Sequence, residues 1–125
     1  MADALQIELV AADRVVWSGQ AKEVIARTVE GDLGVLAGHA PLLSLLVPGI
    51  VEITSLDGDV VRAAVEDGFL SVAGNHVSIL SEDAFLASEV DASAVQAELE
   101  AAKKNDDEPG VLWAEARLRL IDKAS

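Results

Sequence analysis

The chain has 125 residues, of which 51% are hydrophobic, enough for one medium domain or for a small domain with an appendage. Its formal net charge of −13 argues against the basic surface of a nucleic-acid-binding protein, and the absence of cysteine excludes disulfides and thiol chemistry. We expect no secretory signal, because the first residues offer neither a basic n-region nor an apolar h-region, and no direct membrane insertion, because no apolar run reaches the roughly 18 residues of a membrane helix.

The first part of the chain carries short apolar segments that predict strands. Apolar and polar residues alternate over 5–10, as in a half-buried strand. A second strand over 15–17 is expected to end at Ser18-Gly19, a turn signal, and a third is expected over 24–29.

Three glycines then indicate a compact loop. Gly31, Gly34 and Gly38 permit backbone conformations that a side chain would forbid, and Pro41 stiffens the exit from the loop. Residues 42–47, which are apolar except for Ser44, follow and predict another strand.

Two dipeptides predict hairpins, Asp-Gly at 57–58 and Gly-Asn at 74–75, because each lies between apolar segments. Many short strands without intervening helices favour an antiparallel β-sandwich or barrel over residues 1–87. A parallel sheet would need helical crossovers, and the sequence shows none.

The pattern changes at about Ser88, and residues 88–125 predict a short antiparallel hairpin of two helices. Asp91 is placed to cap the first helix and Asp107 the second. Helices this short are marginal alone in water and need a surface on which to pack. Both carry an apolar stripe at helical spacing: Val95, Leu99 and Ala102 in the first, and Trp113, Ala116 and Leu120 in the second.

No group of residues has the spacing of an active site. His39 and His76 stand far apart in the sequence, and a β-sandwich hydrolase or metal enzyme would have to bring them together with Asp57 and Asp59. We expect His39 instead to order its loop by hydrogen bonding to the backbone. By elimination the sequence suggests an interaction module, and a free-standing adaptor for another partner is the second alternative.

Two blocks of sequence resemble one known family. Residues 30–43, EGDLGVLAGHAPLL, closely resemble the epsilon-subunit motif of ATP synthases, G-E-L-G-[IV]-[LY]-P-G-H-A-P-L-L. Residues 67–80 are similar to the same family's G-G-[FI]-[LV]-x-V…V-[ST]-[IV]-L segment. The first strands and residues 116–120 also resemble this family, and the short acidic break at 105–110 resembles its actinobacterial members.

The resemblance implies a non-catalytic central-stalk subunit of a proton-translocating ATP synthase, peripheral on the cytoplasmic face of the plasma membrane. Its sandwich would bind the gamma subunit and rest on the ring of c subunits, coupling rotation of the ring to ATP synthesis. Its helical hairpin would fold on the sandwich or extend toward the alpha/beta head, where it opposes ATP hydrolysis in many bacteria.

The same resemblance implies roles for individual residues. Contacts to the c ring and gamma would come from the glycine-rich segment: Glu30, Asp32, Gly34, Gly38, His39 and Pro41. The basic residues of the last helix, Arg117, Arg119 and Lys123, would approach the acidic surface of the head. Complementation of the helix dipole and solubility are the alternative roles of these three residues.

The chain also departs from the family. Ala37 stands where proline is usual. The ATP-binding motif of some members, [IL]-D-x-x-R-A, corresponds to residues 90–95, and its arginine is replaced by Ala94, so we expect no tight ATP binding at Asp91–Val95 and no other cofactor. A second helix of about 13 residues would span only about 20 Å, which predicts weak regulation at most.

Overall fold

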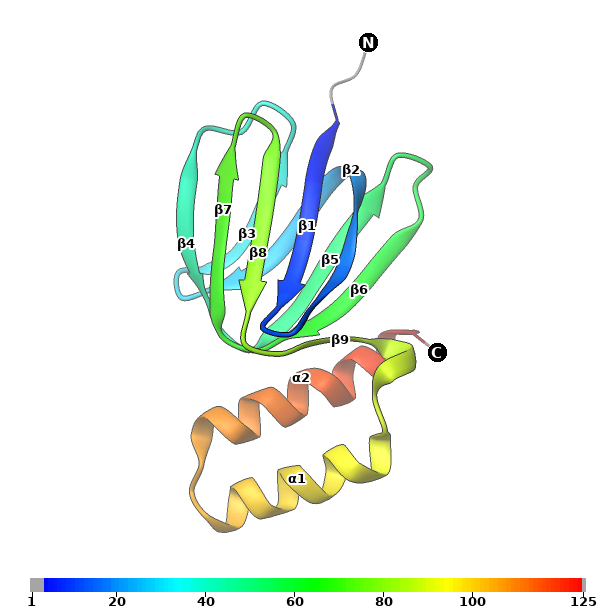
Figure 1. Ribbon diagram of the computed structural model, residues 1–125. Helices are drawn as coiled ribbons and strands as arrows, with labels where there is room; N and C mark the ends of the chain where they lie inside the picture. Colours follow the sequence, from blue (N-terminus) through cyan, green and yellow to red (C-terminus); the bar gives the residue numbers. More distant parts are fainter. Residues whose placement is uncertain (1–3, 125) are drawn as a thin grey trace.

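Two parts make up the computed structural model, which describes residues 4–124 and the side chains of residues 4–122. A β-sandwich stands above a pair of antiparallel helices (Figure 1). The predicted fold class, a sandwich followed by a helical hairpin, is confirmed. The strands of the described part are β1 (Leu5–Ala11), β2 (Arg14–Thr28), β3 (Gly31–Leu36), β4 (Leu42–Leu46), β5 (Gly49–Ser55), β6 (Val60–Val65), β7 (Gly68–Ala73), β8 (His76–Ser81) and β9 (Ala84–Leu86).

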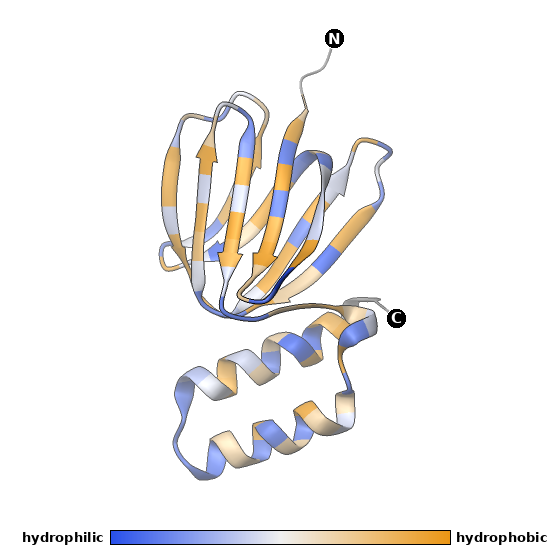
Figure 2. Ribbon diagram, viewed as in Figure 1, coloured by the Kyte–Doolittle hydropathy of each residue, from blue (hydrophilic) through white to orange (hydrophobic). Residues whose placement is uncertain are grey.

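The long strand β2 joins the two layers of the sandwich. Its first half pairs with β1, and its second half pairs with β3 and β5. In Figure 1, β1, β8, β7 and β4 lie in the nearer layer, while β3, β5 and β6 lie behind them. The facing side chains of the two layers form an aliphatic core, in which Leu9, Ile53, Leu70 and Ile79 are fully buried. Figure 2 shows the alternation of apolar and polar residues along β1 that produces this arrangement.

The predicted turn at Ser18-Gly19 is wrong, because β2 runs through both residues. The chain turns earlier, between the paired residues Ala11 and Arg14. Gly19 serves the packing of a side chain: a Cβ atom there would lie 2.9 Å from the ring of Trp17, two residues earlier on the same face. The strands expected over 15–17 and 24–29 are therefore two halves of one strand.

The predicted compact loop is also wrong. Residues 31–36 form strand β3, which pairs with β2 in the register Thr28–Gly31 to Glu23–Leu36. A strand of 6 residues is about 20 Å long. The glycine-rich segment is thus a β-hairpin strand with a turn at one end and a short loop, residues 37–41, at the other.

Both predicted hairpins are confirmed. Gly58 turns between β5 and β6 with a positive φ of 93°, and Gly74 and Asn75 turn between β7 and β8 with φ of 55° and 64°. The expectation of purely antiparallel pairing fails at one place, where β1 pairs with β8 in parallel. Most of the sandwich lies between these two strands in the sequence, so the pairing needs no helical crossover.

The C-terminal elements are a 3-10 turn, η1 (Ala87–Glu89), and two helices, α1 (Ala92–Lys104) and α2 (Glu108–Ala124). Asp91 caps α1, as predicted, by accepting from the N–H groups of Ser93 and Ala94 at 3.0 and 3.3 Å. Asp107 accepts from the N–H of Gly110 at 3.1 Å at the start of α2, as predicted. Helix α2 has 17 residues and spans about 25 Å, longer than the sequence suggested. No helix of the described chain is both long and apolar enough to cross a membrane.

Helix α2 lies between the sandwich and α1. It packs on β5 and β6, while α1 packs on α2 (Figure 1). Ile50, Ala64 and Phe85 are cross-strand neighbours on β5, β6 and β9, and they form the seat of the helix. Trp113 and Leu120 of α2 pack on this seat, and the Trp113 ring stacks against Phe85 with centroids 6.1 Å apart. The hairpin therefore docks through a small apolar cluster separate from the core of the sandwich.

Candidate interaction surfaces

Five of the six residues expected to bind the c ring and gamma, all but Gly34, lie at the two opposite ends of β3. At the first end, the Thr28 hydroxyl donates to the carbonyl of Gly31 at 2.7 Å and accepts from the N–H of Glu30 at 3.1 Å. Gly31 has a positive φ of 111°, which fixes the turn and leaves the Glu30 side chain exposed. Asp32 is exposed beside this turn and pairs with Arg27 across the hairpin, with 3.3 Å between Oδ1 and Nε.

At the second end, hydrogen bonds hold residues 37–41 in place. The N–H of Gly38, whose φ is 87°, donates to Asn75 Oδ1 at 2.7 Å and so ties this loop to the β7–β8 turn. His39 Nδ1 lies 2.7 Å from the carbonyl oxygen of Ala40, and the backbone N–H of His39 donates to the carbonyl of Leu36. The prediction that His39 orders its loop through the backbone is confirmed, and because a carbonyl can only accept, Nδ1 carries the proton in this bond.

Gly34 differs from the other glycines of this segment. It lies inside β3, its φ is not positive, and a Cβ atom built on it would meet nothing within 4 Å. The expected conformational need for glycine at this position is therefore wrong. Pro41 is exposed directly before β4 and has no ladder partner.

An exposed apolar patch was missed in the sequence. Leu45, Phe69 and Leu80 are register neighbours on β4, β7 and β8, and Leu43 lies two residues from Leu45 on the same face. Their exposed fractions are 61%, 40%, 36% and 70%, respectively. We call these four residues the outer apolar row. Its signal was the presence of leucine on both faces of the strand, at 42, 43, 45 and 46, since a strand with one wet face would alternate.

The basic residues of α2 have unequal surroundings. Arg117 is only 7% exposed and donates to both carboxylate oxygens of Glu98 on α1, each at 3.1 Å. Its guanidinium also lies 4.7 Å from the ring centroid of Trp113. Arg119 is exposed and faces a cleft on the sandwich, and the side chain of Lys123 lies outside the described residues.

The linker to the hairpin is fixed by a second arginine. Arg14 donates to the carbonyl of Ala84 at 3.1 Å and to Glu89 at 2.9 Å. The N–H of Leu86 donates to the Glu89 carboxylate, and together with Arg14 it lowers the pKa of Glu89 below its ordinary 4.5.

An acidic group lies where the sandwich meets the hairpin. Glu66 shares a cleft with Glu98 and Arg117. Partial burial raises the pKa of Glu66 above its ordinary 4.5, and the neighbouring Asp67, Asp83 and Glu82 raise it further, while Arg117 acts in the opposite direction. Within the part of the chain that the structure describes, no three histidine or acidic side chains gather as a metal site.

Comparisons with known proteins point in one direction. Residues 4–87 match the family model of the ATP synthase delta/epsilon chain, beta-sandwich domain. The ATP synthase epsilon chain of Streptomyces avermitilis is 51% identical over 121 residues, covering 97% of this chain and 98% of that relative. That of Corynebacterium glutamicum is 44% identical over 122 residues, covering 97% and 95%.

Solved structures agree with these relatives. A chain in the cryo-EM structure of the Euglena gracilis mitochondrial ATP synthase, which contains OSCP, F1 and the c-ring, superposes with a TM-score of 0.73 at 27% identity. The match covers 95% of this chain and 78% of that chain. A chain from the central stalk and c-ring of the Tetrahymena thermophila mitochondrial enzyme has a TM-score of 0.62 at 17% identity and shares the fold.

Proposed function

The chain belongs to the ATP synthase delta/epsilon family, and from this premise we propose that it is a non-catalytic subunit of the rotor. In this role it couples rotation of a c ring to ATP synthesis through gamma, at the cytoplasmic face of the plasma membrane. The observation that carries the proposal is the outer apolar row, because an exposed apolar patch rimmed by polar residues is typical of a protein–protein interface.

The outer apolar row is the surface that we assign to gamma. Leu43, Leu45, Phe69 and Leu80 present an exposed apolar surface across three paired strands. Gly38, His39 and Pro41 lie at the β3–β4 connection, directly before Leu43, and we assign them to the same contact. The hydrogen bonds of this loop support the assignment, since a rigid surface loses little conformational entropy on binding.

The other end of β3 is assigned to the c ring. Glu30 and Asp32 are exposed carboxylates on a turn that Thr28 and Gly31 hold rigid. Such groups suit polar loops with hydrogen-bond donors or cations. Gly34 lies inside the strand between the two ends. Its only contribution to a contact would be the space that a side chain would otherwise fill.

The helical hairpin is assigned a weak regulatory role. The hairpin docks on Ile50, Ala64 and Phe85 through an apolar cluster that is separate from the core of the sandwich, so its release requires no disruption of that core. In the docked form Arg117 is occupied by Glu98, and an approach of Arg117 to the head therefore requires that the two helices separate. Arg119 and Lys123 would contribute charge to the same contact.

We do not assign ATP to residues 91–95. The carboxylate of Asp91 is occupied as the cap of α1, and Ala94 offers no cation to a phosphate. Catalysis is likewise assigned to other subunits.

The test is co-purification of a tagged chain from detergent-solubilised membranes of the source cell, with partners identified by mass spectrometry. We expect gamma, the alpha/beta head and the c ring. A Leu45→Gln, Phe69→Gln chain should bind gamma at least about tenfold more weakly, as for the loss of an interface hot spot. The matched control is Val15→Gln, Leu56→Gln, which removes two exposed apolar side chains elsewhere. Equal loss of gamma from both variants would reject the row as the contact.

A further inference from the structure

We propose that the free edge of β3 is a strand-addition site for an extended, basic segment of a partner protein. Among the strands that the structure describes, β3 pairs with β2 alone. Every second residue of an edge strand directs its N–H and C=O groups away from its neighbour, where an added strand can bind them. Helix α2 packs on β5 and β6, on the far side of β2 from β3, so it leaves this edge uncovered.

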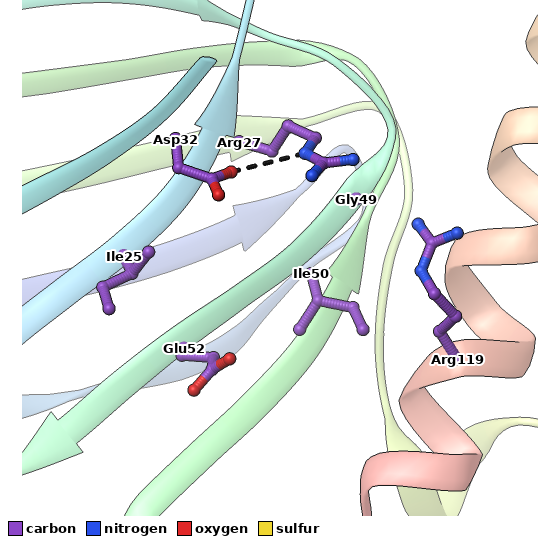
Figure 3. A pocket seen from close by; sticks show the side chains of 7 residues that line it. All are labelled: Ile25, Arg27, Asp32, Gly49, Ile50, Glu52 and Arg119. Atoms are coloured by element: carbon purple, nitrogen blue, oxygen red, sulfur yellow. Dashed lines mark hydrogen bonds and ion pairs between the residues drawn. The ribbon is translucent and has the colours of Figure 1, made fainter.

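Strand β3 lacks the usual protection of an edge strand. Such strands are commonly very short, bulged, or interrupted by proline or lysine. β3 has 6 residues, GDLGVL, and pairs without a bulge. Its one charged side chain, Asp32, is paired with Arg27, and Figure 3 shows this pair on the face of the sheet that also carries Ile25. The edge is therefore able to accept another strand.

An open notch lies at Gly34, in the middle of this edge. Asp32, Gly34 and Leu36 share the outer face of β3, and Leu36 is 57% exposed. A Cβ atom built on Gly34 would meet nothing within 4 Å, and its register partner on β2, Ile25, is 37% exposed. A large apolar side chain on an added strand can cross the glycine and cover Ile25, as aromatic residues do beside glycines in other sheets. A glycine at this position thus has a use that its backbone conformation does not explain.

The charge around the notch selects a basic partner. Glu30 is exposed directly before β3, and Glu23 is the register partner of Leu36 at the other end. A second copy of the chain would bring like charges together, since each copy has a net charge of −13. Lysine or arginine two positions to either side of the aromatic residue would lie on the same face and reach these carboxylates.

The site goes beyond the rotor contacts proposed above. The outer apolar row lies on other strands, β4, β7 and β8. Glu30, Asp32 and Gly34 are shared with the surface assigned to the c ring, but a test on the isolated chain does not depend on that assignment. Failure of one proposal therefore leaves the other standing.

The experiment adds a synthetic peptide, acetyl-TKVFVKT-amide, to the isotope-labelled chain and follows chemical shifts and amide hydrogen exchange by NMR. Its phenylalanine and both lysines share one face in either strand direction. We expect saturable shifts in β3 and slower exchange at alternate residues of β3. The control peptide acetyl-TKFVVKT-amide has the same composition with phenylalanine on the opposite face, and it should bind about tenfold more weakly.

Three variants of the chain complete the test. Gly34→Val fills the notch and should weaken binding of the first peptide about tenfold. Asp32→Lys should weaken it as well and should favour acetyl-TEVFVET-amide instead. Gln20→Val, at an exposed position on the half of β2 that pairs with β1, should bind as the unaltered chain does.

The proposal is overturned if the first peptide produces no saturable shifts in β3, or if the Gly34→Val chain binds it equally well. Sedimentation of the chain without peptide tests the other occupant. A dimer in which the amides of β3 already exchange slowly would assign the edge to a second copy and would also overturn the proposal.

Discussion

Gly68 explains part of the family-like segment at 67–80. A Cβ atom at this position would overlap the carbonyl oxygen of Leu80 and lie 2.8 Å from the Cα of Ser81 on the paired strand. We therefore expect Gly68→Ala to lower the free energy of unfolding by about 3 kcal/mol, since backbone atoms cannot yield as a flexible side chain can. Urea unfolding followed by circular dichroism measures this change.

Gly34→Ala is the matched control for this prediction. Gly34 also lies in a strand, but it has open space around it and no positive φ. Its substitution should change stability by less than about 0.5 kcal/mol. Equal effects at the two positions would show that loss of glycine itself, and not the clash at β8, decides the outcome.

Glu66 should make stability depend on pH. Its pKa in the folded chain lies above the ordinary 4.5, so the folded chain holds this proton more tightly than the unfolded chain does. Stability contributed by Glu66 is therefore full at low pH and is lost as the pH rises from 4.5 through the folded pKa. Glu66→Gln should raise the melting temperature at pH 7, and the gain should vanish below pH 4.5.

The control for Glu66 is Glu8→Gln, which alters an exposed carboxylate on β1 outside the acidic cluster. A gain from Glu66→Gln that persisted unchanged at low pH would contradict an electrostatic origin.

The surroundings of single residues were only partly predictable. The helix caps Asp91 and Asp107 and the backbone contact of His39 follow from local sequence, because their partners lie within three residues. The burial of Arg117 does not, because its partner Glu98 lies 19 residues earlier on a separate helix. From the sequence alone, a basic residue near the end of a helix is expected to be exposed, and only the packing of the neighbouring helix shows that it is buried.

At the level of elements, we expect the docking of α2 to depend mainly on Trp113. Its indole ring packs on Ile50, Ala64 and Phe85. Trp113→Ala should weaken docking by about 3 kcal/mol or more. Amide hydrogen exchange should then accelerate in α1 and α2, while the strands of the sandwich stay protected because their core is separate.

Leu112→Ala is the control for helix propensity and for loss of apolar area. Leu112 neighbours Trp113 on α2 but is exposed. If the sandwich strands lost protection together with the helices in Trp113→Ala, the molecule would be one cooperative unit and the proposed independent release of the hairpin would fail.

The elements themselves were well marked in the sequence, with two instructive exceptions. Turn signals at 57–58 and 74–75 were correct because apolar strands of similar length flank them. The turn predicted at Ser18-Gly19 was wrong because Gly19 makes room for the ring of Trp17. In the sequence, a glycine required for packing cannot be distinguished from a glycine required for a turn. Residues 31–36 misled because their glycines suggested a loop, whereas the pairing partner, β2, decides that they form a strand.

At the level of the whole molecule, the fold class followed from the sequence and the closure of the sandwich did not. Parallel pairing of β1 with β8 and the seat of α2 on three strands both join segments far apart in the sequence. The outer apolar row has the same origin, since Leu45, Phe69 and Leu80 become neighbours only through strand register. The partner segments Glu30–Asp32 and Gly38–Pro41, read as one loop in the sequence, lie at opposite ends of a strand.

The central claim is that this chain couples rotation to ATP synthesis. Its most direct test is proton-driven ATP synthesis by inverted membrane vesicles from source cells that lack the chain, with and without the purified protein added back. We predict that the intact chain restores synthesis, that the Val15→Gln, Leu56→Gln control does so equally, and that Leu45→Gln, Phe69→Gln does not. If the folded, intact chain fails to restore synthesis while the remaining subunits are present, the rotor role is contradicted.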